Sequence, residues 1–331
     1  MTKDKLRAVG IVGTGSYTPS HVLTNFDLEK MVDTSDEWIR ARTGIRERRI
    51  ADPEIASSDL GARAALAALE DANISPSKID MLIVATITPD MFFPSTACVI
   101  QHKIGAVHSA CFDLSAACAG FGYALEIGKQ LIATHTYRTI LIVAVDVLSK
   151  ITDWTDRNTC VLFGDGAGAV VLQAVQKDTG ILSSDLGADG SQMDILQLPG
   201  GGSRNPISQK VIDQKLHYMK MKGKEVFKIA VQSMCKTARK ALHLAKVDVN
   251  DVDLLIPHQA NIRIIEVVAK RLHIPMDKVF VNLHKYGNVS AASTAISIDE
   301  AKKEGRMKKG DIVVLSSFGG GLCWAGTVIR W

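Results

Sequence analysis

A cysteine at the start of an apolar helix is the residue in this sequence best suited to nucleophilic chemistry. Cys118 follows a predicted strand over residues 111–114 and opens a helical stretch that is apolar nearly all round at its start. Unpaired N–H groups and the positive end of the helix dipole favour a thiolate there, and the thiolate is the nucleophilic form. From position alone, a structural core cysteine fits the pattern about equally well. The pattern makes Cys118 the most thiolate-like of the six cysteines.

A histidine and an asparagine occupy comparable places later in the chain. His258 ends a predicted strand in "LLIPHQAN", and active groups of α/β sheets collect at such strand ends. Asn288 lies in "HKYGNVSAAS", after a strand and before a helix of small residues. Taken singly, His258 is more often a structural or surface residue, and Asn288 a turn residue beside Gly287.

An internal repeat brings these three residues together. Its matching positions are Asp80 with Asp253, Leu114 with Leu283, and Ile140 with Ile312. The offsets are 173, 169 and 172 residues, and Asn288 follows Cys118 by 170. If the halves pair about a pseudo-twofold axis, both helix starts meet near the centre. Cys118, His258 and Asn288 then converge on one site.

The elements that must position this site alternate between short apolar strands and helices, which indicates an α/β fold. We expect strands over residues 9–12, 81–86, 111–114, 140–145, 167–172, 254–256, 279–282 and 312–315. The repeat divides the chain into halves 1–174 and 175–331, the first with the cysteine and the second with the histidine and asparagine. Between the copies, a loop-rich insertion is expected at about 175–224.

Glycine-rich segments indicate a further part of the site and exclude some cofactors. "SSFGGGLCWAG" at 316–326 follows a strand, and its backbone N–H groups could form an oxyanion hole, although a tight turn explains it too. "FGDGAGAVV" at 163–171 lacks the Gly-Lys-Ser/Thr of a phosphate loop, and "VGTGSY" at 12–17 lacks the third glycine of a dinucleotide fingerprint. We therefore expect no nicotinamide cofactor.

Composition narrows the class of protein. The 331 residues are 47% hydrophobic and 22% charged, as in ordinary soluble globular proteins. A net charge of +4 and 5% aromatic residues argue against nucleic acid binding. We expect a cytoplasmic protein without a membrane span, a signal peptide or a metal site, because no long apolar segment and no Cys-x-x-Cys pair occurs. Two basic clusters are solvated faces or sites for a phosphorylated ligand: Arg40, Arg42, Arg46, Arg48 and Arg49, and Lys220, Lys222, Lys224 and Lys228.

Several motifs, in order over nearly the whole chain, resemble those of β-ketoacyl-acyl-carrier-protein synthase III. They are "DTSDEWIRARTGIRERR", "AACAGF", "DWTDRNTCVLFGDGAGA", "PHQANIRI", "GNVSAAS" and "FGGGLCWAG". The resemblance implies the thiolase fold, two similar halves in a five-layer αβαβα arrangement, and a homodimer. It also implies condensation of an acyl-CoA primer, acetyl-CoA in the first instance, with malonyl-acyl-carrier protein. Acyl-CoA is a substrate, and no cofactor is implied.

The resemblance assigns roles to individual residues. Cys118 would carry the acyl group, His258 and Asn288 would stabilise the enolate, and the N–H groups of Cys118 and Gly320 would hold the oxyanion. Phe318 would crowd the malonyl carboxylate toward decarboxylation. The other implied contacts are Trp38, Arg42 and Arg157 for the CoA adenine and phosphates, Gly223, Phe227, Ala260 and Asn261 for the pantetheine channel, and Phe93 for the partner subunit's acyl pocket.

Docking of the acidic acyl carrier protein needs a local basic patch, because a net charge of +4 is too small to attract it. Arg263, Lys270 and Arg271 in the helix after "PHQAN", with Lys228 nearby, are the expected patch. Lys222 and Lys224 depart from the family pattern near the channel mouth, and their role is open.

Other functions fit the sequence less well. Thiolases use a second catalytic cysteine and elongating synthases two histidines, whereas Asn288 holds that position here. Chalcone-type synthases share the three residues but lack the flanking motifs. A papain-like hydrolase gives no reason for duplicated halves, and an intact Cys118, His258 and Asn288 argues against a silent scaffold.

Overall fold

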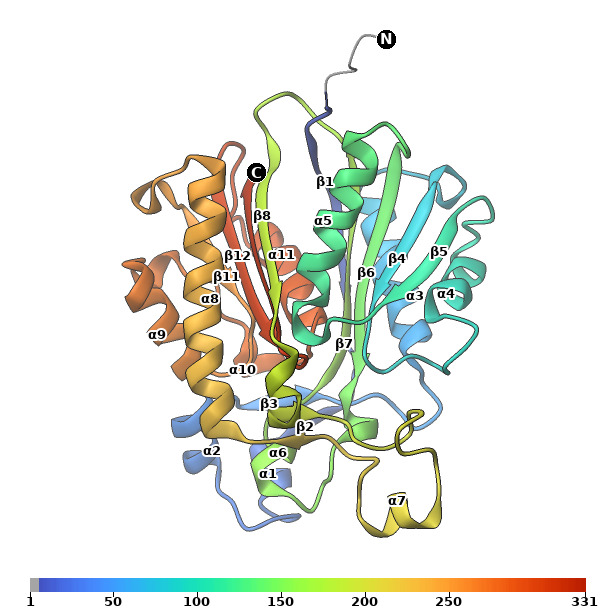
Figure 1. The fold of residues 1–331 in the computed structure, drawn as a ribbon, viewed down its shortest axis with the longest axis vertical. Coiled ribbons are helices and arrows are strands. Elements are labelled where there is room, and N and C mark those ends of the chain that lie inside the picture. Colours follow the sequence, from blue (N-terminus) through green and yellow to red (C-terminus); the bar gives the residue numbers. More distant parts are fainter. Residues whose placement is uncertain (1–5) are drawn as a thin grey trace.

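The computed structural model describes residues 6–331 and contains two main β-sheets with helices on both faces of each (Figure 1). The first sheet has the strand order β1-β7-β6-β4-β5. Its strands are β1 (Val9–Tyr17), β4 (Met81–Ala85), β5 (Ala110–Leu114), β6 (Thr139–Val147) and β7 (Asp165–Ala174). β4, β5 and β6 are parallel to one another, whereas β7 is antiparallel to both β1 and β6. Every residue of β4 and β6 is buried, as expected for central strands between two helical layers.

The second sheet repeats this arrangement with the strand order β11-β12-β13-β8. Its strands are β8 (Gly180–Ala188), β11 (Leu254–Pro257), β12 (Ile312–Gly319) and β13 (Cys323–Arg330). β11 and β12 are parallel, as β4 and β6 are, and β13 is antiparallel to both of its neighbours. The two sheets therefore share one order, in which β8 is the counterpart of β1.

Two strand predictions need correction. The stretch 175–224, expected to be loop-rich, contains the nine-residue strand β8. The segment 279–282, expected to be a strand, makes a single parallel bridge from Val279 to Leu255 and one hydrogen bond from the N–H of Phe280 to the Leu255 carbonyl. It occupies the place that β5 holds beside β4 in the first sheet.

Helices complete five layers, with one helical layer between the sheets and one outside each (Figure 1). The helices are α1 (Asn25–Leu28), α2 (Asp36–Thr43), α3 (Ser57–Asp71), α4 (Thr96–Ile104), α5 (Gly120–Ala133), α6 (Arg157–Cys160), α7 (Gln209–Asp213), α8 (Gly223–Ala245), α9 (Ile262–Leu272), α10 (Leu283–Tyr286) and α11 (Ala292–Lys303). α5 and α11 lie between the sheets, α3 and α4 cover the first sheet, and α8 and α9 cover the second. The short strands β2 (Val22–Thr24) with β3 (Glu47–Arg49), and β9 (Leu196–Gln197) with β10 (Lys220–Met221), form two separate ribbons.

The glycines of "VGTGSY" serve helix packing in this fold. A Cβ atom at Gly15 would lie 2.3 Å from the backbone nitrogen of Ala68 in α3, and one at Gly13 would lie 2.5 Å from the Ala68 carbonyl oxygen. These glycines let α3 lie directly on β1. The motif is thus a packing device, and the segment continues as strand β1 where a dinucleotide fingerprint would turn into a helix.

Within residues 6–331, no helix is long and apolar enough to cross a membrane. The same part of the chain contains no group of three or more His, Cys, Asp or Glu side chains placed to hold a metal ion.

Candidate active site

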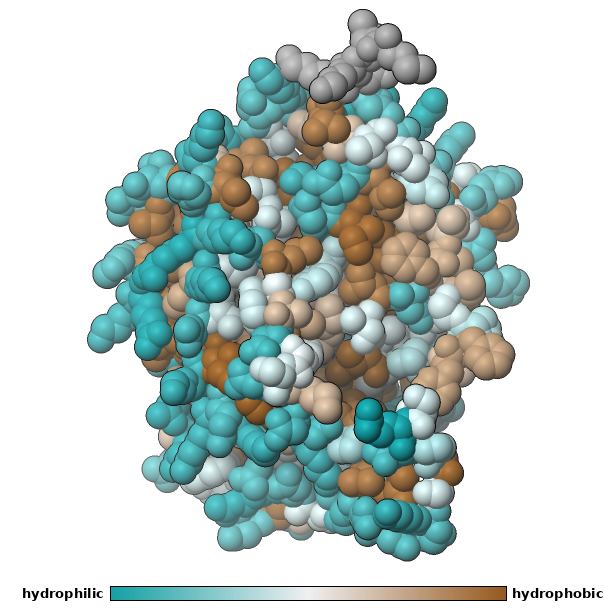
Figure 2. Space-filling model, viewed as in Figure 1, coloured by the Kyte–Doolittle hydropathy of each residue, from teal (hydrophilic) through white to brown (hydrophobic). Residues whose placement is uncertain are grey.

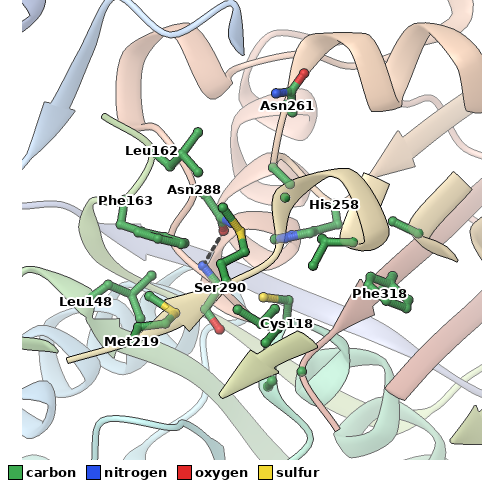
Figure 3. Close-up of a pocket in the computed structure, with 18 of the residues that line it drawn as sticks. Cys118, Leu148, Leu162, Phe163, Met219, His258, Asn261, Asn288, Ser290 and Phe318 are labelled. Carbon is green, nitrogen blue, oxygen red and sulfur yellow. Dashed lines mark hydrogen bonds between the residues drawn. The ribbon is translucent and has the colours of Figure 1, made fainter. Parts of the chain in front are cut away.

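A cavity of about 900 Å³ opens between the halves and is lined by Cys118, His258 and Asn288. Cys118 comes from the turn before α5, His258 from the end of β11, and Asn288 from the segment between α10 and α11. Figure 3 shows the Cys118 sulfur, the His258 ring and the Asn288 side chain gathered around one space. The structure thus brings together the three residues that the repeat predicted.

Cys118 is held by a tight backbone arrangement at the start of the central helix. It lies in the short 3-10 helix Ala117–Ala119, which leads directly into α5, and Ala117 adopts a left-handed φ of 44°. Gly319 at the end of β12 packs against it, since a Cβ atom there would lie 2.5 Å from the Cys118 backbone nitrogen. Cys118 in one half is therefore positioned by the sheet of the other half.

Burial raises the pKa of the Cys118 thiol to about 12, which is opposite to the direction expected from a helix N-terminus. The side chain is 8% exposed, so the cost of desolvating a thiolate is larger than the local stabilisation. The prediction that Cys118 is the most thiolate-like of the six cysteines was wrong. The thiol has to lose its proton when it reacts.

His258 is neutral at physiological pH. Burial lowers its pKa to about 4, because the imidazolium form is poorly solvated in the pocket wall. The backbone N–H of His258 donates to the Ser316 carbonyl at 2.8 Å, whereas the ring atom Nδ1 is buried without a hydrogen-bond partner. A neutral imidazole can present one N–H donor to a ligand.

Asn288 is oriented by hydrogen bonds on both sides. Its Oδ1 accepts the backbone N–H of Ser290 at 2.9 Å (Figure 3). Its backbone N–H donates to the Leu162 carbonyl at 2.8 Å, and its own carbonyl accepts the N–H of Gly164 at 3.1 Å. Because the amide oxygen is occupied, the side-chain NH₂ group is left as the donor for a ligand.

The glycine-rich segment predicted as an oxyanion site lies beside the cysteine. Gly320 lines the cavity at the turn between β12 and β13, and a Cβ atom at Gly320 would lie 3.8 Å from the Ala117 side chain. Phe318 also lines the cavity and is 4% exposed. This geometry is compatible with the roles expected for both residues.

Three residues expected to contact CoA form one cluster at the mouth of the cavity. The Arg42 guanidinium carbon lies 5.7 Å from the Trp38 ring centroid, and that of Arg157 lies 5.2 Å from it. Arg157 also donates to the Asp33 carbonyl at 2.7 Å. Trp38 and Arg42 line the cavity, whereas Arg157 contacts the same ring without lining the cavity. Two cations beside an aromatic ring can bind phosphates and stack a base.

The four residues expected along the pantetheine channel, Gly223, Phe227, Ala260 and Asn261, all line the cavity. Asn261 caps α9 by accepting the Arg263 N–H, and its amide donates to the Arg42 carbonyl at 3.0 Å. This bond joins the channel wall to the arginine at the mouth.

The expected docking residues lie on the surface around α8 and α9, where Figure 2 shows hydrophilic side chains gathered. Lys228, Arg263, Lys270 and Arg271 are all exposed, and Arg263 also lines the cavity mouth. Of the two unexplained lysines, Lys222 forms an ion pair with Asp194, and Lys224 lines the mouth.

Arg48 departs from the expectation for its cluster, whereas Phe93 lies outside this chain's cavity. Arg48, counted in a basic cluster that would be solvated or bind phosphate, is fully buried and donates to the Leu23 carbonyl, the Asn25 side chain and the Val161 carbonyl. It is a structural residue. Phe93 is 85% exposed and does not line this chain's cavity. A residue that reaches into a partner's pocket would have the same exposure in a single subunit.

The sequence reasoning gave no role to several residues of the site. Leu148, Phe163 and Met219 pack together as an apolar cluster on the cavity wall. Ser290 lies beside the cysteine, and Asp146 is buried at the end of β6. Asp146 interrupts an otherwise apolar strand, which is the signal that could have identified it.

Comparison with known proteins agrees with this geometry. Residues 112–190 match the family model for 3-oxoacyl-[acyl-carrier-protein] synthase III, and residues 242–331 match the model for its C-terminal part. The chain is 56% identical over 324 residues to the β-ketoacyl-[acyl-carrier-protein] synthase III of Caldanaerobacter subterraneus subsp. tengcongensis, covering 98% of each chain. It is 51% identical to the protein of that name from Clostridioides difficile, covering 97% of this chain and 98% of the relative.

Solved structures give the same result. The crystal structure of 3-oxoacyl-[acyl-carrier-protein] synthase III from Aquifex aeolicus matches with a TM-score of 0.92 at 47% identity, covering 98% of this chain and all of the other. The thiolase-like fold with duplicated halves is therefore confirmed. The chain belongs to the 3-oxoacyl-[acyl-carrier-protein] synthase III family of condensing enzymes.

Proposed function

We propose that this cavity carries out the condensation of an acyl-CoA primer with malonyl-acyl-carrier protein, giving 3-oxoacyl-acyl-carrier protein, CoA and CO₂. The reaction is an acyl transfer that initiates fatty acid synthesis. The observation that supports it best is the convergence of one buried thiol with two neutral hydrogen-bond donors, Cys118 with His258 and Asn288, in a single cavity.

In the first half-reaction, the Cys118 sulfur attacks the acyl-CoA carbonyl carbon and CoA departs. The oxyanion forms next to the backbone of Cys118 and Gly320, where N–H donors stabilise developing charge. The apolar cluster of Leu148, Phe163 and Met219 offers space for a short acyl chain such as acetyl.

In the second half-reaction, malonyl-acyl-carrier protein loses CO₂ and its enolate attacks the Cys118 thioester. His258 and Asn288 donate hydrogen bonds to the thioester carbonyl as it becomes an enolate. Two observations support this role. The lowered pKa of His258 keeps its ring neutral, so that it can donate a hydrogen bond. The Ser290 N–H occupies the Asn288 side-chain oxygen, so that the side-chain NH₂ group remains available as a donor. Buried Phe318 disfavours a charged carboxylate beside it, which promotes decarboxylation.

The substrates reach the cysteine through the mouth and channel already described. Trp38, Arg42 and Arg157 bind the CoA nucleotide, and Gly223, Phe227, Ala260 and Asn261 line the path of its pantetheine arm. Lys228, Arg263, Lys270 and Arg271 dock the acyl carrier protein. No cofactor takes part, and the enzyme acts in the cytoplasm.

The protein acts as a homodimer in this proposal. Met91, Phe92 and Phe93 are 47%, 81% and 85% exposed, an apolar group that a second subunit would cover. Phe93 then enters the partner subunit's acyl pocket.

Two measurements on the purified protein test the function. Incubation with acetyl-CoA should add one acetyl group at Cys118, located by peptide mass spectrometry, and Cys118→Ser should abolish it. Adding malonyl-acyl-carrier protein should then release CO₂ and form a 3-oxoacyl product. A hydrolase would release free acetate without a new carbon–carbon bond, and acetylation of another cysteine would refute the assignment.

A further inference from the structure

A buried carboxylate next to the active site has no role in the steps above. Asp146 is the penultimate residue of β6 and is completely inaccessible to solvent. Its Oδ1 accepts four hydrogen bonds, from the Thr86 hydroxyl at 3.0 Å, the Ile87 N–H at 2.8 Å, and the Thr88 N–H and hydroxyl at 3.1 and 2.9 Å. Its Oδ2 is buried and has no hydrogen-bond partner.

Ser290 connects this carboxylate to the nucleophile. Its side chain is 1% exposed, its hydroxyl oxygen is buried without a hydrogen bond, and its backbone is fixed by the bond to Asn288 at a left-handed φ of 50°. Burial raises the pKa of both Cys118 and Asp146, and the nearby Ser290 hydroxyl acts in the opposite direction on each of them, to a smaller extent. Figure 3 shows Ser290 beside Cys118.

Two orphaned polar atoms beside a reactive thiol are unusual, because buried polar groups are nearly always paired and an unpaired one is costly. A serine hydroxyl can accept one proton and donate another, so it can link a thiol to a carboxylate. The first half-reaction needs such a link. Cys118 must lose a proton, and the neutral His258 is a weak base because its pKa is about 4.

We propose that Asp146, acting through the hydroxyl of Ser290, accepts the Cys118 proton during acyl transfer from CoA. This inference rests on the proposed function and adds a proton path to it.

The step balances without any further reactant. As the sulfur–carbon bond forms, the Cys118 proton moves to Ser290 Oγ, and the Ser290 proton moves to Asp146 Oδ2. As the carbon–sulfur bond to CoA breaks, the same protons return in the reverse direction and protonate the departing CoA thiolate. The products are acyl-Cys118, CoA thiol and an ionised Asp146.

Asp146 is the group on this proton path that changes its protonation state near neutral pH, because the groups that face it do not ionise in that range. Thr86 and Thr88 follow β4, Ser290 precedes α11, and the Cys118 thiol precedes α5; of these only the thiol ionises, at much higher pH. On β7 the register places Gly166 opposite Asp146. The neighbouring Asp165 carboxylate accepts hydrogen bonds from other groups, namely the Ala51 N–H and the Ser149 N–H and hydroxyl.

The test is the pH profile of Cys118 acetylation by acetyl-CoA, measured by rapid quench and intact mass on the full-length protein. Burial raises the pKa of Asp146 to about 6. The wild-type acetylation rate should therefore rise with pH near pH 6, as the carboxylate loses its proton. This rising part of the pH–rate profile is called the limb below. Ser290→Ala and Asp146→Asn should both lose this limb, and their rates at pH 7 should fall about 10²-fold.

Matched variants separate this proton path from a general effect of removing a buried carboxylate or a cavity side chain. Asp165→Asn removes an equally buried carboxylate that does not face Ser290, and it should keep the limb. His258→Ala should keep the limb as well. Ser290→Ala retains the backbone bond to Asn288 and loses only the hydroxyl, so it remains informative if Asp146→Asn fails to fold.

The outcomes that overturn each proposal are distinct. Wild-type rates and an unchanged limb in Ser290→Ala refute the proton path while leaving the function intact. Loss of the limb in His258→Ala alone assigns the base to His258 and also refutes the path. Absence of any acetylation of the wild-type protein refutes the proposed function itself.

Discussion

The two halves of the molecule have one architecture but carry different residues at matching positions. β4 pairs with β6 as β11 pairs with β12, and both strand pairs are related by an offset of 172 residues, as Ala85 with Ala144 and Pro257 with Ser316 illustrate. At or just after the ends of these strands and of the segments that follow them, the matching positions are Thr86 with His258, Cys118 with Asn288, and Asp146 with Phe318.

Because the matching positions carry different residues, each half of the molecule supplies different functional groups. The first half supplies the thiol and a buried carboxylate, and the second supplies two neutral donors and an aromatic ring. The duplication provides a frame in which two helix starts meet, and in the proposed function the unlike residues give this frame an acylation side and an enolate side. Substitutions in the first half of the molecule should therefore affect mainly acylation, and those in the second half mainly the condensation step.

The largest effect is expected for the donors of the second half. His258→Ala and Asn288→Ala should each lower the condensation rate 10²- to 10³-fold, because each removes a hydrogen bond to the forming enolate. Acetylation of Cys118 should continue in both variants, as measured by intact mass. If Asn288→Ala abolishes acetylation while malonyl decarboxylation survives, the division between halves is wrong.

The contact between halves should matter almost as much. In Gly319→Ala the new methyl group would lie 2.5 Å from the Cys118 nitrogen, so the backbone of the nucleophile has to shift. A displacement of this kind costs on the order of 10²-fold in rate, and the loss should appear in acetylation, the step of the opposite half. Gly202→Ala, with nothing within 4 Å of the added Cβ, is the matched control and should behave as wild type.

Asp146, which occupies the position matching Phe318, should affect how the free energy of unfolding depends on pH. Because the pKa of Asp146 is raised to about 6 in the folded state, folding binds a proton between the unfolded and folded pKa values. This group therefore destabilises the protein progressively as the pH rises from about 4 to 6, by up to about 3 kcal/mol above that range. Asp146→Asn should gain stability relative to wild type over the same interval, measured by urea denaturation. A difference that does not change with pH would contradict a raised pKa.

The smallest effect is expected at the surface. Arg263→Glu should raise the KM for malonyl-acyl-carrier protein about tenfold, because steering by an exposed charge alters the association rate. Added salt should reduce the gap from wild type, and acetylation by acetyl-CoA should be nearly unaffected. Lys309→Glu makes the same charge change at an exposed position that does not line the cavity and serves as the control. Equal impairment of acetylation by Arg263→Glu would identify a CoA contact or a structural residue.

Much of the fold could be predicted from the sequence because its central strands are continuous apolar runs at a repeating offset. Strand β8 was missed because Ser183, Ser184 and Asp185 form a run of three polar residues, which breaks the alternation that marks a strand. The 279–282 segment has strand-like residues, but its pairing with β11 stops after one bridge.

The positions of Cys118, His258 and Asn288 were predictable because each adjoins a helix start or strand end within a recognisable motif. The electrostatics of Cys118 were not. The helix argument is local, whereas the raised pKa comes from burial by both halves, which only the folded chain defines. Asp146 and Ser290 were missed for a related reason, since they lie 144 residues apart and only the fold brings them together.

The place of β13 has a consequence for the order of events during synthesis. This strand, Cys323–Arg330, comes last in the chain but lies inside the second sheet, between β12 and β8. On the ribosome, β8 has no partner on that side until about 140 more residues have been made. Meanwhile the apolar side of α5 that packs against the second half has nothing to cover it. The nascent first half is thus the stage at which this protein most needs a chaperone, and a premature stop just before Cys323 would leave a chain unable to complete its second sheet.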